Sequence, residues 1–208
     1  MVLISNIRGE YMSKNKIEIL ALIDRSGSML GIMDEAVGAF NAFIEKQREL
    51  SLNDKVKVTL ASFDNQYEVI FDRVKLAKVP KLTVDMVEPR GMTALYDSIG
   101  KLITGAKHPK RDTIMLIQTD GFENSSTEYD VSAIKRLITL KESTGWEVNF
   151  VGAGIDAVSV GKTIGISPLR SHSVDATVGG MDAYGASITA ATTSYRAAKS
   201  DIDIDITS

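Results

Sequence analysis

The sequence has 208 residues, of which 44% are hydrophobic and 25% are charged, so it can bury the core of one domain. Lys and Arg number 24 against 27 Asp and Glu, a net charge of −3 that lacks the basic excess typical of nucleic-acid binders. The absence of cysteine excludes disulfides, thiolate metal sites and a cysteine nucleophile, and two histidines are too few for a Cys/His zinc site.

Two features bear on where the protein works. No segment approaches the roughly 18 consecutive apolar residues that a membrane-spanning helix needs. Residues 1–15 have a short apolar start but no signal-peptide core, and Met12 offers an alternative start, so residues 1–11 carry no argument. These features predict a cytoplasmic protein.

Strand-like and helix-like segments alternate in the first half of the chain. Residues 17–23 are a nearly continuous apolar run, which is typical of a strand buried on both faces of a parallel sheet. Residues 32–50 space their apolar side chains as a helix does. Residues 56–63 and 67–74 follow as two strands, and the short turn at 64–66 between them predicts an antiparallel hairpin.

The alternation continues after an irregular stretch at residues 75–92. It predicts, in order, a helix at 94–104, a strand at 113–118, a helix at 129–143, a strand at 147–151, a short helix at 156–164, a strand at 172–178 and a helix at 181–199. This order is typical of an α/β doubly wound sheet. We assign residues 16–199 to one domain, with 1–15 as an N-terminal extension and 200–208 as an acidic tail that is either frayed or an added edge strand.

Oxygen-bearing side chains follow several of the predicted strands. Asp24, Ser26 and Ser28 come directly after the first strand, in the string Asp-Arg-Ser-Gly-Ser-Met. Thr93 precedes a helix, and Asp120 ends the strand at 113–118. In an open α/β sheet, ligands bind beyond the carboxyl ends of the strands. Carboxylate and hydroxyl oxygens are hard ligands, so this set suits Mg²⁺, Mn²⁺ or Ca²⁺, and an octahedral oxygen shell favours Mg²⁺ or Mn²⁺.

Taken together, these strings resemble the von Willebrand factor type A (VWA) domain. The metal-ion-dependent adhesion site (MIDAS) of that family is Asp-x-Ser-x-Ser, then a Thr and an Asp in distant loops. The resemblance covers residues 16–199. It implies a Rossmann-like, mostly parallel sheet of six strands with one antiparallel edge strand, which would be the strand at 67–74.

The resemblance also implies how the site works. The hydroxyls of Ser26, Ser28 and Thr93 would bind the metal directly, and Asp24 and Asp120 would act mostly through bound waters. One metal position would stay open for a Glu or Asp carboxylate of a protein partner. The chain is most similar in style to stand-alone VWA proteins of bacteria and phages, some of which work beside chaperone-like ATPases. We therefore expect a non-enzymatic adaptor in an intracellular assembly, with no nucleic-acid or membrane partner.

The sequence departs from the family pattern near Thr93, where the family often has Gly-Gly-Thr and this chain has Arg90-Gly91-Met92-Thr93. We expect Met92 and the positive charge of Arg90 to lie at the rim of the site and to favour an acidic or mixed partner. The polar loop at 122–126 lies on the same predicted rim.

Other interpretations of these residues stay open. Ser and Asp also cap helices and shape turns, and Asp97 is either an acid in the first turn of a helix or a further ligand. Residues 152–157 match a dinucleotide-binding pattern, but on a late strand, and 161–163 match only part of a phosphate loop. The alternative functions are a metal-independent scaffold, a metal-assisted phosphohydrolase, or a hydrolase that pairs a serine with one of the two histidines.

Overall fold

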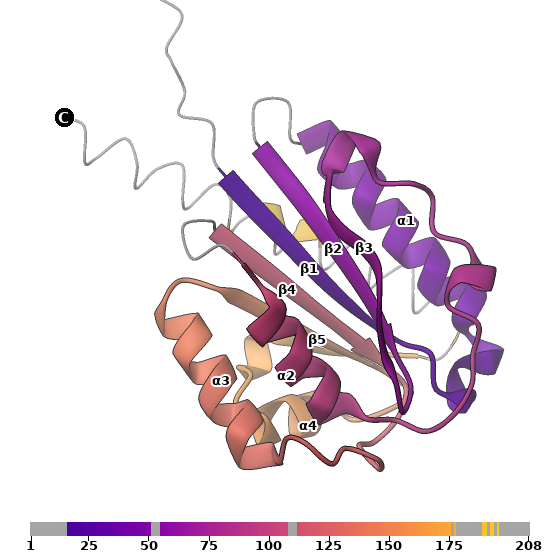
Figure 1. The fold of residues 1–208 in the computed structure, drawn as a ribbon, viewed down its shortest axis with the longest axis vertical. Coiled ribbons are helices and arrows are strands. Elements are labelled where there is room, and N and C mark those ends of the chain that lie inside the picture. Colours follow the sequence, from indigo (N-terminus) through magenta and orange to yellow (C-terminus); the bar gives the residue numbers. More distant parts are fainter. Residues whose placement is uncertain are drawn as a thin grey trace, which may run out of the picture.

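The computed structural model describes residues 16–50, 55–107 and 112–175, together with 177, 189–190, 192–193 and 195. Their strands form one sheet of six, in the order β3-β2-β1-β4-β5-β6 (Figure 1). The strands are β1 (Lys16–Asp24), β2 (Lys55–Phe63), β3 (Tyr67–Lys75), β4 (Asp112–Thr119), β5 (Glu147–Ala153) and β6 (Ser171–Val174). The pair β2–β3 is antiparallel and the other four pairs are parallel, which confirms the predicted doubly wound sheet with one antiparallel edge strand.

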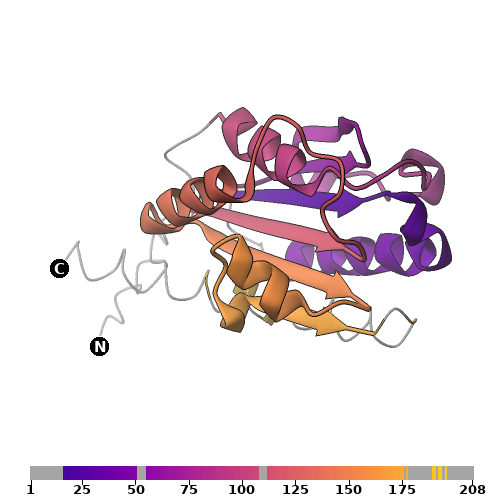
Figure 2. The ribbon, with the colours of Figure 1, turned by 90° about the horizontal axis from the view of Figure 1, so that it is seen from below.

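The helices lie on the two faces of this sheet. They are α1 (Met33–Leu50), α2 (Leu95–Gly105), α3 (Val131–Ser143) and α4 (Ala157–Thr163), with short 3-10 turns η1 (Gly27–Gly31), η2 (Leu76–Lys78), η3 (Val84–Met86) and η4 (Pro168–Arg170). Figure 2 shows α1 and α2 on opposite sides of β1. None of the described helices is long and apolar enough to cross a membrane.

Most predicted boundaries hold within two residues, but the strand predicted at 172–178 is shorter, since β6 runs only from Ser171 to Val174. Helix α3 begins at Val131 rather than at residue 129, because the Asp130 side chain accepts the N–H of Ala133 and caps the helix there. Of the helix predicted at 181–199, the structure describes only residues 189–190, 192–193 and 195, and these are helical. The predicted extension at 1–15 and tail at 200–208 lie outside the described residues.

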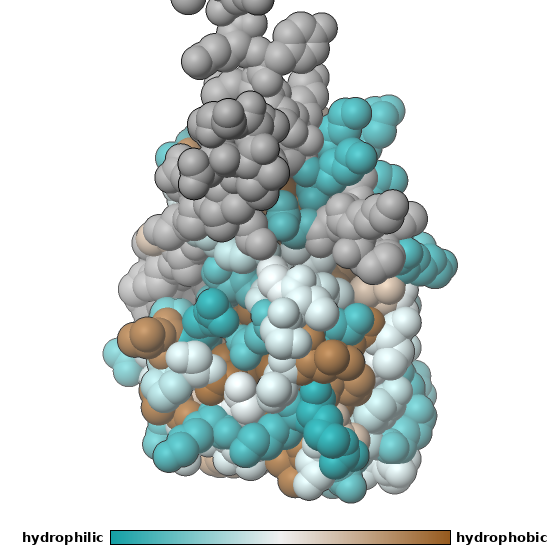
Figure 3. Space-filling view, turned by 90° about the vertical axis from the view of Figure 1, so that its left-hand side faces the viewer, coloured by the Kyte–Doolittle hydropathy of each residue, from teal (hydrophilic) through white to brown (hydrophobic). Residues whose placement is uncertain are grey.

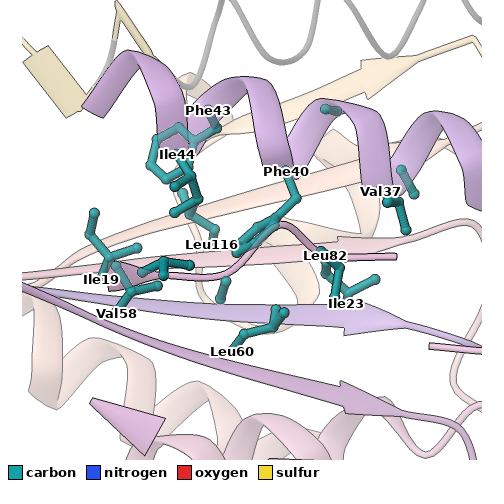
Figure 4. Packing of buried hydrophobic residues seen from close by; sticks show 14 of the residues in the cluster. Ile19, Ile23, Val37, Phe40, Phe43, Ile44, Val58, Leu60, Leu82 and Leu116 are labelled. Atoms are coloured by element: carbon teal, nitrogen blue, oxygen red, sulfur yellow. The ribbon is translucent and has the colours of Figure 1, made fainter. Parts of the chain in front are cut away.

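Both faces of β1 are buried, which explains its continuous apolar run. Ile19 and Ile23 point toward α1, where they pack with Phe40 and Ile44, whose four-residue spacing puts them on one side of the helix (Figure 4). The alternate residues of β1, including Leu22, belong to the second core cluster, which packs under α2, α3 and α4. Fully burying such a side chain stabilises the fold by roughly 1.5–3 kcal/mol, so these two clusters hold the sheet between its helices.

At the carboxyl ends of the central strands, loops that lead to helices on both faces of the sheet come together. The chain leaves β1 toward α1 and leaves β4 toward α3, on opposite faces of the sheet. Strand order reverses between these neighbouring strands, which is the switch point where open α/β sheets bind ligands. Asp24 and Asp120 lie at that point, one at the end of β1 and one directly after β4.

Candidate metal centre

Asp24 anchors the site at the end of β1. Its side chain is fully buried, and one carboxylate oxygen accepts the backbone N–H of Ser26 at 2.7 Å. The other oxygen accepts the hydroxyl of Thr119, the last residue of β4. The carboxylate therefore ties the ends of two parallel strands together. Sequence reasoning missed Thr119, although it stands beside Asp120 in the Thr-Asp-Gly string.

The hydroxyl groups of Ser26 and Ser28 lie side by side, one in the interior and one at the surface. Ser26 is buried and Ser28 is exposed, and their Oγ atoms lie 3.1 Å apart. The Ser28 hydroxyl donates to Oδ1 of Asp120 at 2.7 Å. Because η1 begins at Gly27, the chain turns between the serines, and both side chains reach the same point.

Thr93 reaches this point from a third loop. A Cβ atom built on Gly121 would lie 3.2 Å from the Thr93 Oγ1 and 3.6 Å from the Ser28 Oγ, so both hydroxyls flank the same glycine. Asn124 holds Thr93 in place, because its side-chain oxygen accepts the Thr93 N–H at 2.8 Å and its own N–H donates to the Thr93 carbonyl at 3.0 Å. The structure thus brings together all five residues predicted from the sequence.

The two carboxylates at the site are not neutralised by any described side chain. Burial raises the pKa of Asp24 to about 6, and the nearby charge of Asp120 adds to that increase. Burial also raises the pKa of Asp120. Neither carboxylate takes part in an ion pair among the described residues. A buried negative charge needs a cation or a proton, so the environment and the hard oxygen donors both fit a divalent cation.

The described part of the chain holds no cluster of acidic or imidazole side chains that suits a metal ion. No group of three or more His, Asp or Glu side chains is placed there to hold an ion. The hydroxyl-rich set at Asp24, Ser26, Ser28, Thr93 and Asp120 is therefore the metal-binding arrangement that the described residues offer.

A neighbouring acid, Asp64, holds two of the site loops together. It lies directly after β2 and is buried, with Oδ2 accepting the Arg90 Nε–H at 2.7 Å and lying 3.5 Å from the Arg25 Nε. Backbone bonds reinforce the contact, because the Arg90 N–H donates to the Arg25 carbonyl at 2.7 Å and the Gly27 N–H donates to the Gly91 carbonyl at 3.2 Å. We call Asp64, Arg25 and Arg90 the arginine latch.

The latch corrects one expectation from the sequence. Arg90 was expected to place a positive charge at the rim and so favour an acidic partner, and its side chain is 53% exposed, but Asp64 pairs with that charge. Met92 is 56% exposed, as expected of a rim residue. Gly91 is required here, since its φ is +68° and a Cβ would lie 2.3 Å from the Asn65 Oδ1.

Asp97 is engaged with backbone rather than with the metal-binding set. Its two carboxylate oxygens accept the N–H groups of Thr127, Glu128 and Tyr129. Burial disfavours the charge, but these three donors outweigh burial, and the pKa of Asp97 is lowered. Asp97 therefore fixes the loop between β4 and α3 against the start of α2.

The remaining motifs have structural roles. A Cβ on Gly152 would lie 2.5 Å from Ile155 Cγ1, and the Asp156 carboxylate accepts the Ser159 N–H, so the start of α4 is capped by the chain itself. A Cβ on Gly161 would lie 2.2 Å from the Ser171 Oγ, so that glycine allows close packing. No hydrogen bond of the described residues joins His172 to a serine, and the other histidine, at position 108, lies outside them.

Comparison with known proteins identifies the fold. No protein-family model matches the sequence, and no curated protein matches it. Solved structures do match, among them the vWF domain of the pilus tip protein Mfa5 from Porphyromonas gingivalis. That match has 10% identity and a TM-score of 0.63, and covers 86% of this chain and 96% of that one. The chain has the von Willebrand factor type A fold.

Two longer proteins share this VWA fold. A von Willebrand factor type A protein from Catenulispora acidiphila is 18% identical with a TM-score of 0.58, over 85% of this chain and 42% of that one. The proximal thread matrix protein 1 of the mussel byssus, with a zinc-occupied MIDAS motif, is 14% identical with a TM-score of 0.59, over 82% of this chain and 46% of that one. This chain thus spans less than half the length of either protein.

Proposed function

We propose that this VWA domain is a metal-dependent protein-interaction module. The observation that carries the proposal is the meeting of three hydroxyls and two carboxylates that no cationic side chain among the described residues pairs with. The zinc-occupied MIDAS of the mussel protein supports a divalent metal, and the hard donors here favour Mg²⁺. When bound, the cation supplies a positive charge that attracts a carboxylate from a protein partner.

The residues divide this work according to their contacts. Ser26, Ser28 and Thr93 hold the metal through hydroxyls that converge beside Gly121. Both oxygens of Asp24 already accept hydrogen bonds from the chain, which suits a residue that acts through bound waters. Asp120 accepts the Ser28 hydroxyl through Oδ1, and this hydrogen bond orients the hydroxyl.

An interaction role fits better than catalysis. A metal-assisted phosphohydrolase needs a general base within reach of the attacking water. Both oxygens of Asp24 and Oδ1 of Asp120 already accept hydrogen bonds from the protein, and no described hydrogen bond or ion pair brings a histidine or a lysine to the site. The Mfa5 protein is a pilus tip protein and the mussel protein is a matrix protein, which also favours binding over turnover. Mg²⁺ as the metal, a cytoplasmic adaptor role and a chaperone-like ATPase as partner stay predictions.

The first test is thermal unfolding with saturating MgCl₂ and with EDTA. We expect Mg²⁺ to stabilise the wild type, by about 2.7 kcal/mol at one hundred times its Kd. The Ser26→Ala/Ser28→Ala variant should lose this increase. Ser159→Ala, an exposed serine on α4, is the matched control and should keep it. Equal stabilisation of the wild type and the double variant would overturn the site assignment.

Two further assays separate the alternatives. Turnover of a generic phosphoester in Mg²⁺ that is lost in the double variant would favour the phosphohydrolase. Capture of the same partner in Mg²⁺ and in EDTA, by wild type and double variant alike, would favour the metal-independent scaffold.

A further inference from the structure

Each of the three loops that meet at the candidate metal centre carries one exposed hydrophobic side chain. Leu30 is 76% exposed and comes two residues after Ser28. Met92 is 56% exposed and directly precedes Thr93. Phe122 is 64% exposed and comes two residues after Asp120. We call these three residues, Leu30, Met92 and Phe122, the apolar collar.

The loops that carry the collar contact one another. The Gly27 N–H donates to the Gly91 carbonyl, which joins the Leu30 loop to the Met92 loop. Gly121 lies against both Thr93 and Ser28, which places the Phe122 loop beside the other two. The loops that carry the collar residues therefore meet at one place, although they are far apart in the sequence.

This grouping differs from the other exposed hydrophobic residues. A single exposed leucine, such as Leu140 on α3 or Leu169 in η4, is ordinary for a protein surface. Figure 3, which views the molecule from the left-hand side of Figure 1, shows brown patches separated by teal and white residues. The collar residues instead stand on the three adjoining loops where a ligand is expected.

The loops beneath the collar are held by internal contacts. Met29 is fully buried, so η1 presents Leu30 to solvent from an anchored position. Arg90 is bound to Asp64 just before Met92. Asn124 is bound to Thr93 just after Phe122. A surface that is ordered before binding loses less conformational entropy when a partner docks on it.

The charged side chains of these loops pair with other groups of the protein. Asp64 neutralises Arg90, and the carboxylate of Glu123 accepts the N–H groups of Ser125, Ser126 and Tyr96. The rim therefore offers no basic patch to a polyanion or to a run of acidic residues. It matches a surface with one negative charge, directed at the metal, and apolar groups around that charge.

We propose that the partner is a protein segment with a single Asp or Glu flanked by hydrophobic side chains, and that the apolar collar binds those side chains. The proposal rests on the proposed function, because it needs the metal to take the carboxylate. The metal then fixes the register of the segment, and the collar determines which segment binds.

The test is selection from a random twelve-residue peptide library displayed on phage, bound in MgCl₂ and eluted with EDTA. We expect the eluted peptides to share one acid with hydrophobic residues on both sides. Replacing that acid by its amide in a synthetic peptide should abolish binding. Enrichment of acidic runs without hydrophobic neighbours, or no enrichment by the wild type, would overturn the proposal.

Variants separate the collar from the metal centre. Phe122→Ser, Met92→Ser and Leu30→Ser should each weaken binding of the selected peptide about tenfold, as for central interface residues. They should keep the Mg²⁺-induced increase in thermal stability. Leu140→Ser, which removes a similarly exposed side chain on α3, is the matched control and should bind the peptide normally.

The outcomes distinguish two failures. If the wild type shows no Mg²⁺-induced stabilisation, the proposed function itself fails. If Mg²⁺ stabilises the wild type and the collar variants bind the peptide as tightly as the wild type does, only the collar proposal fails.

Discussion

Two buried carboxylates lie at the ends of neighbouring strands and have opposite surroundings. Asp24 ends β1, and Asp64 directly follows β2, which pairs with β1. Both are at most 1% exposed. Asp64 lies against the guanidinium groups of Arg25 and Arg90. Asp24 has hydroxyl and amide donors and a second acid, Asp120, nearby, and it pairs with no cation in the part of the chain that the structure describes.

The difference separates a structural acid from a candidate metal-site acid. Arginines neutralise Asp64 permanently, so its loops are joined whether or not anything binds. Asp24 keeps an uncompensated charge, which costs stability until a cation arrives. The two roles are coupled, because Arg25 of the latch stands between Asp24 and Ser26 in the sequence and shares their loop.

The largest expected effect comes from breaking the balanced cluster. Asp64→Ala removes the buried carboxylate that Arg25 and Arg90 share, and it leaves Arg25 only its ion pair with the exposed Glu68. We expect the free energy of unfolding to fall by about 3–5 kcal/mol. Urea denaturation in EDTA measures this loss. Asp85→Ala, in the exposed η3 turn, is the control and should stay within about 0.5 kcal/mol of the wild type. A loss below about 1 kcal/mol for Asp64→Ala would show that the latch is not structural.

At Asp24, by contrast, we expect that removing the charge raises the free energy of unfolding. Asp24→Asn keeps the shape of the side chain and removes its charge, so in EDTA at pH 7.5 we expect the variant to be more stable than the wild type by about 1–3 kcal/mol. The variant should gain nothing from Mg²⁺. A variant less stable than the wild type in EDTA would show that Asp24 is already compensated.

The raised pKa of Asp24 also predicts how stability depends on pH. The pKa of Asp24 is about 6 in the folded protein against 3.8 as the reference value, so the folded state binds this proton more tightly. In EDTA, the wild type should therefore gain stability relative to Asp24→Asn as pH falls from 7 toward 4. Parallel stability curves for the two proteins would contradict the raised pKa.

Local sequence patterns predicted the sheet because they report local burial. The apolar run at 17–23 predicted a strand covered on both faces, and β1 is such a strand. The polar turn at 64–66 predicted the hairpin, and β2 and β3 form it. The five site residues followed from a resemblance in motif, and the structure places them together.

The motif singled out Asp24, but the sequence could not show the surroundings of either acid, because these are built from distant residues. Arg90 is 26 positions from Asp64, and Thr119 is 95 positions from Asp24. No local pattern reveals which of two aspartates after two strands will meet an arginine. For the same reason the sequence did not show that Asp64, in the turn between β2 and β3, pairs with the positive charge of Arg90.

The smallest expected effect concerns Arg90, which is the exposed arm of the latch. Its side chain is 53% exposed, and its backbone bond to Arg25 does not depend on the guanidinium. Arg90→Ala should therefore loosen the Thr93 loop only slightly and weaken Mg²⁺ binding by about tenfold or less. Calorimetric titration with MgCl₂ measures this change. Because salt screens exposed ion pairs, the difference between wild type and variant should shrink as NaCl is raised, whereas the loss in Asp64→Ala should persist. If Arg90→Ala leaves Mg²⁺ affinity unchanged but weakens partner binding, then Arg90 serves the partner, and the latch depends on Arg25 alone.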